Sequence, residues 1–152
     1  MRDIMIKSLA IMLPASILII GCAGGRPANL GVRDGRLAPC PSSPNCVSSQ
    51  STDKDQAVEP LPYSSSTPEA IAGLRKIILQ MERTKIVTET NNYLRVEFAS
   101  TLWRFVDDVE FSFDDHVKLI QVRSASRMGY SDFGVNRKRV EAIRAAWQAS
   151  GK

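Results

Sequence analysis

The 152-residue sequence is poor in the residues on which catalytic and metal sites usually depend. It contains one histidine, His116, and none of its three cysteines forms a Cys-x-x-Cys pair. No Gly-x-Ser-x-Gly, His-Glu-x-x-His or phosphate-binding glycine loop is present. The acidic pairs Asp107-Asp108 and Asp114-Asp115 lie at opposite ends of one expected strand, roughly 20 Å apart at ~3.3 Å per residue, which is too far for one metal ion. We therefore expect no metal and no cofactor, and catalysis is the weaker interpretation.

The sequence also lacks a hydrophobic run long enough to cross a bilayer. The apolar stretch from Leu9 to Ile20 is shorter than the ~20 residues that a transmembrane helix needs. It follows Arg2 and Lys7 and ends at Ile19-Ile20-Gly21-Cys22, a pattern typical of a lipoprotein signal peptide. We predict a signal peptide over residues 1–21 and acylation of Cys22, with palmitate among the acyl chains. Ordinary secretion with cleavage elsewhere and a permanent membrane span are the alternatives.

This signal predicts a protein anchored in the cell envelope. Acylation of Cys22 gives nearly permanent anchoring, because each buried methylene contributes about 0.8 kcal/mol. Ala23 stands where an aspartate would signal retention in the inner membrane, so the expected location is the periplasmic side of the outer membrane where two membranes exist. Residues 22–37 contain four glycines without apolar periodicity and predict a flexible tether. Residues 38–152 predict a single globular domain.

Cys40 and Cys46 form an even pair once Cys22 is acylated, as an oxidising compartment favours. The seven residues from one cysteine to the other are rich in proline, serine and asparagine, which form turns. A ring of this size is worth about 2.4 kcal/mol by the chain-entropy estimate. The two cysteines have five residues between them, whereas the Cys-x-x-Cys pairs of redox and zinc sites have two. We therefore predict a structural disulfide.

The remaining chain shows helical and then strand periodicity. Thr67 is the expected N-cap of a helix that buries Ile71, Leu74, Ile78 and Met81. Four antiparallel strands are expected over residues 84–90, 93–98, 105–113 and 117–127, with a type I′ turn at Asn91-Asn92, and a last helix over residues 135–149. The sequence therefore predicts an α+β fold: a helix, a four-stranded antiparallel sheet and a C-terminal helix, preceded by a disulfide-closed loop. We expect residues 48–66 to wrap around the domain, with room for one edge strand.

The segment from Arg123 to Arg139 is the richest in polar chemistry. Strand alternation places Arg123 and Arg127 on one face and Ser124 and Ser126 on the other. Backbone N–H groups at the start of the last helix could join the arginines in holding an anion. The candidate anion-binding residues are Arg123, Ser124, Ser126, Arg127, Asn136 and Arg137. The alternative is structural: Asp132 caps the helix, and the arginines pair with Asp107, Asp108 and Glu110 on the neighbouring strand.

Three stretches resemble a bacterial family catalogued as domain of unknown function 1499. They are Cys-Pro-Ser-Ser-Pro-Asn-Cys-Val-Ser-Ser (Cys40 to Ser49), Phe-Val-Asp-Asp-Val-Glu-Phe (Phe105 to Phe111) and the run from Arg123 through Met128-Gly129-Tyr130 to Arg137. The similarity extends from about Ala38 to Trp147. It implies one fold unit in the cell envelope and adds no reaction.

The charge distribution narrows the range of partners. From Arg123 onward the chain carries seven lysines or arginines and two acids, whereas residues 22–122 carry eleven and thirteen. Export separates the protein from nucleic acid, so the expected partners are the membrane and an anionic lipid, a cell-wall glycan or an envelope protein. We interpret the chain as a non-catalytic binding or scaffolding lipoprotein, with Trp103 and Trp147 as core or rim aromatics. The alternatives are a small hydrolase or transferase using Ser124 or Ser126, and a purely structural lipoprotein.

Overall fold

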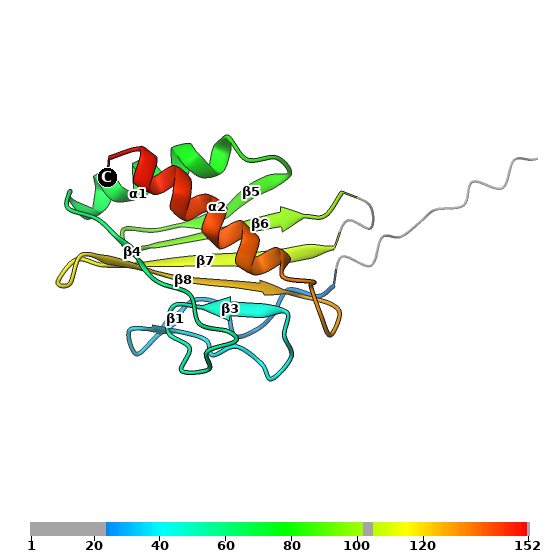
Figure 1. The fold of residues 1–152 in the computed structure, drawn as a ribbon. Helices are drawn as coiled ribbons and strands as arrows, with labels where there is room; N and C mark the ends of the chain where they lie inside the picture. The colour runs from blue at the N-terminus through cyan, green and yellow to red at the C-terminus, as the bar shows by residue number, and fades with distance from the viewer. Residues whose placement is uncertain (1–23, 102–104, 152) are drawn as a thin grey trace, which may run out of the picture.

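A six-stranded sheet with two helices on one face forms the body of the molecule (Figure 1). The computed structural model describes residues 24–101 and 105–151. The strands run in the order β3-β8-β7-β6-β5, all antiparallel, and β4 pairs with β8 as well. The sheet consists of β3 (Cys46–Ser48), β4 (Leu61–Pro62), β5 (Thr84–Glu89), β6 (Tyr93–Ala99), β7 (Val106–Asp114) and β8 (Leu119–Ser126). The covering helices are α1 (Thr67–Leu79) and α2 (Val135–Ala149). Within the described residues, no helix is long and apolar enough to span a membrane.

The α+β prediction is confirmed, and the prediction of four strands is wrong. The long strands β5 to β8 form the expected meander, and α2 has the expected limits. β3 was not predicted, and β4 lies within residues 48–66, where room for one edge strand was expected; with three and two residues, both are too short for alternation to be visible in a sequence. Both pair with β8, whose outer edge would otherwise carry unpaired N–H and C=O groups.

The core lies between the sheet and the helices because apolar residues alternate on β6, β7 and β8. Leu94, Val109 and Val122 are each fully or almost fully buried on this face. The helices bring Leu74, Ile78 and Ile143 onto them, together with Trp147, whose indole N–H donates to the carbonyl of Pro62 at 2.8 Å. Trp103 lies outside the described residues.

Helix α1 is capped by Ser66 rather than by Thr67. The Ser66 hydroxyl accepts the N–H of Glu69, and the Glu69 carboxylate accepts the N–H of Ser66, which together form a capping box. Thr67 instead bonds outside the helix, to Asp115 at 2.7 Å and to Tyr63 at 3.0 Å. Its hydroxyl therefore ties the start of the helix to the turn between β7 and β8.

The β5–β6 turn at Asn91-Asn92 is not of type I′, since that type needs positive φ at both residues and neither has it. A bulge between Ile86 and Thr88 shifts the register of the same hairpin. The true positive-φ pair is Asp34-Gly35, with φ of 50° and 73°, and it joins β1 (Val32–Arg33) to β2 (Arg36–Leu37).

Residues 24–39, which we call the N-terminal strap, run along the sheet on the side away from the helices (Figure 1). They include part of the expected tether. Leu37 in the strap is buried, and the N–H of Gly31 donates to the carboxylate of Glu110 at 2.7 Å. The strap leads directly into the predicted disulfide, which is confirmed: Cys40 and Cys46 are bonded with Cα atoms 5.6 Å apart. The disulfide thus ties the end of the strap to the first residue of β3.

Candidate functional site

The sheet face under the strap carries an ordered array of opposite charges. Because side chains alternate, Arg95 of β6, Glu110 of β7 and Arg123 of β8 lie opposite one another in one row across the strands. Glu97 and Asp108 form the next row, which is completed by the small residues Ala125 and Cys46. We call this surface the charged face; its ionisable members are Tyr93, Arg95, Glu97, Asp108, Glu110, Arg123 and Arg127.

Asp108 is the most densely paired acid of the charged face. Arg127 grips it with two bonds, from Nε at 2.8 Å and from Nη2 at 3.0 Å, and Arg95 donates to it at 2.8 Å. Arg127 also reaches Glu97 at 2.5 Å. Only 1% of the Asp108 side chain is exposed, and a carboxylate this deeply buried needs such partners. The bond to Asp108, followed by the one to Glu97, raises the pKa of Arg127.

Glu110 organises the other row. The phenol of Tyr93 donates to it at 2.7 Å, on the same oxygen that accepts from Gly31, and Arg123 Nη1 donates to its second oxygen at 3.2 Å. Burial and then the bond to Glu110 raise the pKa of Tyr93 well above its ordinary value. The phenol therefore remains a proton donor across the whole neutral range.

Three guanidinium donors on this face have no acceptor among the described residues. They are Nε and Nη2 of Arg95 and Nε of Arg123, all fully enclosed. An unpaired buried donor costs about 1–3 kcal/mol, more when the group is charged. The arginines of the charged face are therefore incompletely satisfied by the carboxylates that surround them.

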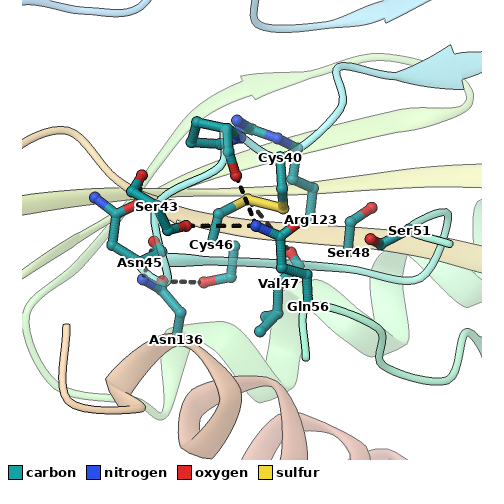
Figure 2. The surroundings of a disulfide bond; sticks show 12 residues. Cys40, Ser43, Asn45, Cys46, Val47, Ser48, Ser51, Gln56, Arg123 and Asn136 are labelled. Atoms are coloured by element: carbon teal, nitrogen blue, oxygen red, sulfur yellow. Dashed lines mark hydrogen bonds between the residues drawn. A yellow bond between two sulfur atoms is a disulfide. The ribbon is translucent and has the colours of Figure 1, made fainter. Parts of the chain in front are cut away.

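A cavity of about 340 Å³ opens beside the disulfide and reaches Arg123. Figure 2 shows Arg123 next to Cys40 and Cys46, with Gln56 holding the loop by bonds to the carbonyls of Pro41 and Ser43. The charged face contributes Asp108, Arg123, Ala125 and Arg127 to the lining, Ser126 at the end of β8 also reaches it, and the strap and loop contribute Pro27, Asn29, Pro39, Cys40 and Pro41. The small side chain of Ala125 leaves this space between Asp108 and Cys46. A larger hollow of about 760 Å³ lies between α1 and α2, and none of the three unpaired donors lines it.

Ser124, Ser126 and Asn136 meet on the opposite face of β8, under α2. The Ser124 hydroxyl donates to Asn136 at 2.5 Å, and the Asn136 amide donates to Ser126 at 2.9 Å and to the carbonyl of Asn45 at 3.0 Å. Figure 2 shows Asn136 beside Asn45. Arg139 bonds to Ser124, Asn136 and Asp107, the last at 2.6 Å. Asn136 is fully buried, so this cluster joins β8, α2 and the loop before β3.

The six candidate residues therefore do not form one site. Arg123 and Arg127 face the cavity, whereas Ser124 and Asn136 lie on the far side of the sheet. Arg137 donates to the carbonyls of Asp55 and Ala57, both at 2.8 Å, and so fixes α2 to the chain after β3. Asp132 accepts the N–H groups of Gly134 and Asn136 at the start of α2.

Sequence reasoning did not select Arg95, Glu97, Tyr93 and Arg139. Tyr93, Arg95 and Glu97 alternate with apolar residues, which predicted that the three share one face of the strand. The pattern could not show whether that face is exposed to solvent or covered by another segment. The signal was available on the next strands, because Asp108, Glu110, Arg123 and Arg127 continue the same parity with complementary charge.

The arrangement offers little to a nucleophilic mechanism. Ser124 is fully buried, and its neighbours are Asn136 and the cation of Arg139, neither of which is a base. His116 lies in the β7–β8 turn, at the opposite end of the sheet from Ser126. Within residues 24–101 and 105–151, no group of three or more potential metal ligands is present.

These features define a class: a small α+β domain whose antiparallel sheet has helices on one face and a strapped, charge-paired surface on the other. The chain belongs to the family described as protein of unknown function (DUF1499), whose model matches residues 36–147. The match covers all the long strands of the domain, α1, and α2 as far as Trp147. A search of curated proteins gives no match.

Proposed function

We propose that this chain is a lipid-anchored, non-catalytic protein of the cell envelope whose domain binds an oxyanion in the cavity beside the disulfide. The lipoprotein pattern at Cys22 and the disulfide typical of oxidising compartments support the location. Ala23 supports the outer membrane, on its periplasmic side, in an organism with two membranes.

One observation carries the binding proposal: Arg123 is 95% buried, has one donor without an acceptor, and lines the cavity. A phosphate or carboxylate in the cavity would lie against Arg123 and Arg127, which line it, in a setting where charged hydrogen bonds are strong. The three arginines and three carboxylates of the charged face give it no net charge. We therefore expect the cavity to bind a small anionic group rather than a polyanion. A lipid phosphate, a glycan carboxylate and an acidic peptide side chain all share this chemistry.

Binding would be measured by calorimetry on the acylated protein with three probes: glycerol 3-phosphate, N-acetylmuramate and an acidic peptide. The matched variants are Asn29→Trp, which fills the cavity from its exposed rim, and Asn91→Trp, at the exposed β5–β6 turn. Neither change touches an ion pair. We expect the wild type and Asn91→Trp to bind one probe, and Asn29→Trp to lose it.

Equal binding by both variants would place the ligand elsewhere, and the absence of binding to every probe would contradict the oxyanion proposal. The mass of the purified protein tests the anchor separately, because acylation of Cys22 adds a mass that Cys22→Ser lacks. The hydrolase or transferase alternative has less support, since Ser124 is buried without a base and the Ser126 hydroxyl accepts from the amide of Asn136 rather than bonding to a base.

A further inference from the structure

Large apolar side chains are exposed together at one end of the sheet. We call this surface the apolar end, and its members are Phe105, Met128, Tyr130, Phe133 and Val135, with 43%, 42%, 76%, 89% and 46% exposure. They come from two segments: the residue just before β7, and the connection from β8 to α2 with the first residue of that helix. An exposed apolar cluster of this kind marks a site of contact with a membrane or another protein.

The two segments are held side by side. The N–H of Arg127 donates to the carbonyl of Val106 at 3.1 Å, which extends the β7–β8 pairing beyond Asp107 and Ser126. The next pair in the same register is Phe105 with Met128. Asn45 fixes the connection further by donating to the carbonyl of Gly129. The apolar end is thus one surface of defined position.

Phe133 contributes nothing visible to the fold. Its φ is 54°, in the left-handed region that a bulky residue rarely adopts, and its side chain is 89% exposed. Asparagine or glycine would suit this backbone better. An aromatic side chain held in solvent at such a position points to a contact outside the chain.

The apolar end lies where the chain leaves its expected anchor. A Cβ on Gly24 would lie 2.9 Å from Cγ of Met128 and 3.0 Å from Cβ of Arg127, so Gly24 is packed against the β8–α2 connection. Figure 1 shows the described chain beginning at this end of the sheet. Cys22 precedes Gly24 by two residues, which span at most about 7 Å. Acyl chains on Cys22 would therefore hold the bilayer surface within reach of Met128 and its neighbours.

We infer that the apolar end is a membrane-docking surface, with Tyr130 and Phe133 entering the headgroup region of the bilayer that holds the acyl chains of Cys22. This inference rests on the proposed lipid anchor. Aromatic side chains favour the interface between headgroups and hydrocarbon, and the exposed cations Arg26 and Lys138 near the same end favour anionic headgroups. Docking would hold the domain in one orientation on the membrane and would turn the cavity lined by Pro27 and Arg127 towards the lipid side.

The test uses two single-tryptophan additions to the full, acylated protein in vesicles of phosphatidylethanolamine and phosphatidylglycerol. Phe133→Trp places the probe at the apolar end, and Val117→Trp places it at another exposed position, in the β7–β8 turn at the other end of the sheet. Emission is compared with and without brominated acyl chains, and the wild-type signal from Trp103 and Trp147 is subtracted. We expect a blue shift and loss of most of the added emission for Phe133→Trp, and neither change for Val117→Trp.

Each other outcome overturns the inference. An acylated Phe133→Trp protein that is bound to vesicles but not quenched would retain the anchor and exclude docking. A blue shift that follows protein concentration without lipid would assign the surface to a second copy of the chain. A mass that shows no acyl chain on Cys22 would remove the anchor and, with it, the premise of docking.

Discussion

At the scale of single residues, Glu110 shows how this protein tolerates a fully buried charge. It accepts from a backbone N–H of the strap, from a phenol of β6 and from a guanidinium of β8. Each donor comes from a different element, so the carboxylate acts as a junction between them. A hydrogen bond to a buried charge contributes about 1.5–3 kcal/mol to stability. Removal of a single donor to Glu110 should therefore give a measurable loss.

Replacement of Tyr93 by phenylalanine removes one of these donors, and we expect Tyr93→Phe to lower the free energy of unfolding by about 1.5–3 kcal/mol at neutral pH. The raised pKa of Tyr93 gives this difference a pH dependence. The phenol stays protonated in the folded protein but ionises near pH 10 in the unfolded chain. Its contribution is therefore complete below about pH 10 and is lost as pH rises towards the folded-state pKa.

Urea unfolding from pH 7 to pH 11 measures this effect as the difference between wild type and Tyr93→Phe. The difference should shrink above about pH 10, because only the wild type has this phenol to ionise. A difference that is constant across the series would mean that the Tyr93 proton is not coupled to folding.

Arg123 gives a second prediction, with Arg75 as its matched control. Arg123→Met leaves Glu110 buried without its cation, and we expect a loss of about 3–5 kcal/mol. Arg75→Met breaks the exposed pair with Glu89 and should cost at most about 1 kcal/mol. Denaturant unfolding of both variants decides the case, and the double variant Glu110→Gln, Arg123→Met should recover part of the loss. Similar costs for Arg75→Met and Arg123→Met would refute the buried-pair account.

At the scale of elements, two neighbouring residues at the start of α1 have different roles: Ser66 caps the helix, and Thr67 bonds to the β7–β8 turn. Ser66→Ala removes the capping hydroxyl and should destabilise the protein by about 1 kcal/mol. Thr67→Ala removes the surface bond to Asp115 and the half-buried bond to Tyr63 but no bond of the cap, and it should cost less. Thermal unfolding of the two variants compares them directly; a larger loss for Thr67→Ala would mean that the link to the β7–β8 turn outweighs the cap.

The elements also show what a sequence can predict. β6, β7, β8 and α2 were predictable because each has enough residues for its periodicity to be visible. β3 and β4 were not, since a strand of two or three residues is defined by its partner and not by its own pattern. The strap carried a hairpin signal, Asp34-Gly35, which its glycine-rich composition masked. The choice of Thr67 over Ser66 as cap was wrong: serine is the better N-cap of the two, and Ser66 with Glu69 three residues later forms the capping-box pattern.

The candidate site was predictable only to the level of strand faces. Parity correctly separated Arg123 and Arg127 from Ser124 and Ser126. It could not show that Arg127 donates two hydrogen bonds to Asp108 on the neighbouring strand, nor that residues 24–39 cover the arginines. Those facts depend on how segments distant in sequence pack against the sheet, and no local pattern encodes that packing.

At the scale of the whole molecule, the strap is part of the folded domain. A chain that begins at Ala38 loses Leu37, whose burial is worth about 1.5–3 kcal/mol, and the Gly31 donor to Glu110. We expect residues 38–152 to unfold at lower urea concentration than residues 24–152. Leu37→Ala in the longer chain isolates the apolar part of that effect. Equal midpoints for the two lengths would mean that the strap lies on the sheet without stabilising it.

The pairing of β3 and β4 with β8 sets an order on synthesis. β8 ends at Ser126, so residues 46–62 have no native strand partner until most of the chain has been made. The meander from β5 to β8 has no such delay, because each of its strands pairs with the strand just before it. At the start of this region, Cys46 and the preceding Cys40 are close enough in sequence to join without help from the rest of the fold. The first half of the domain is thus completed by its last strand.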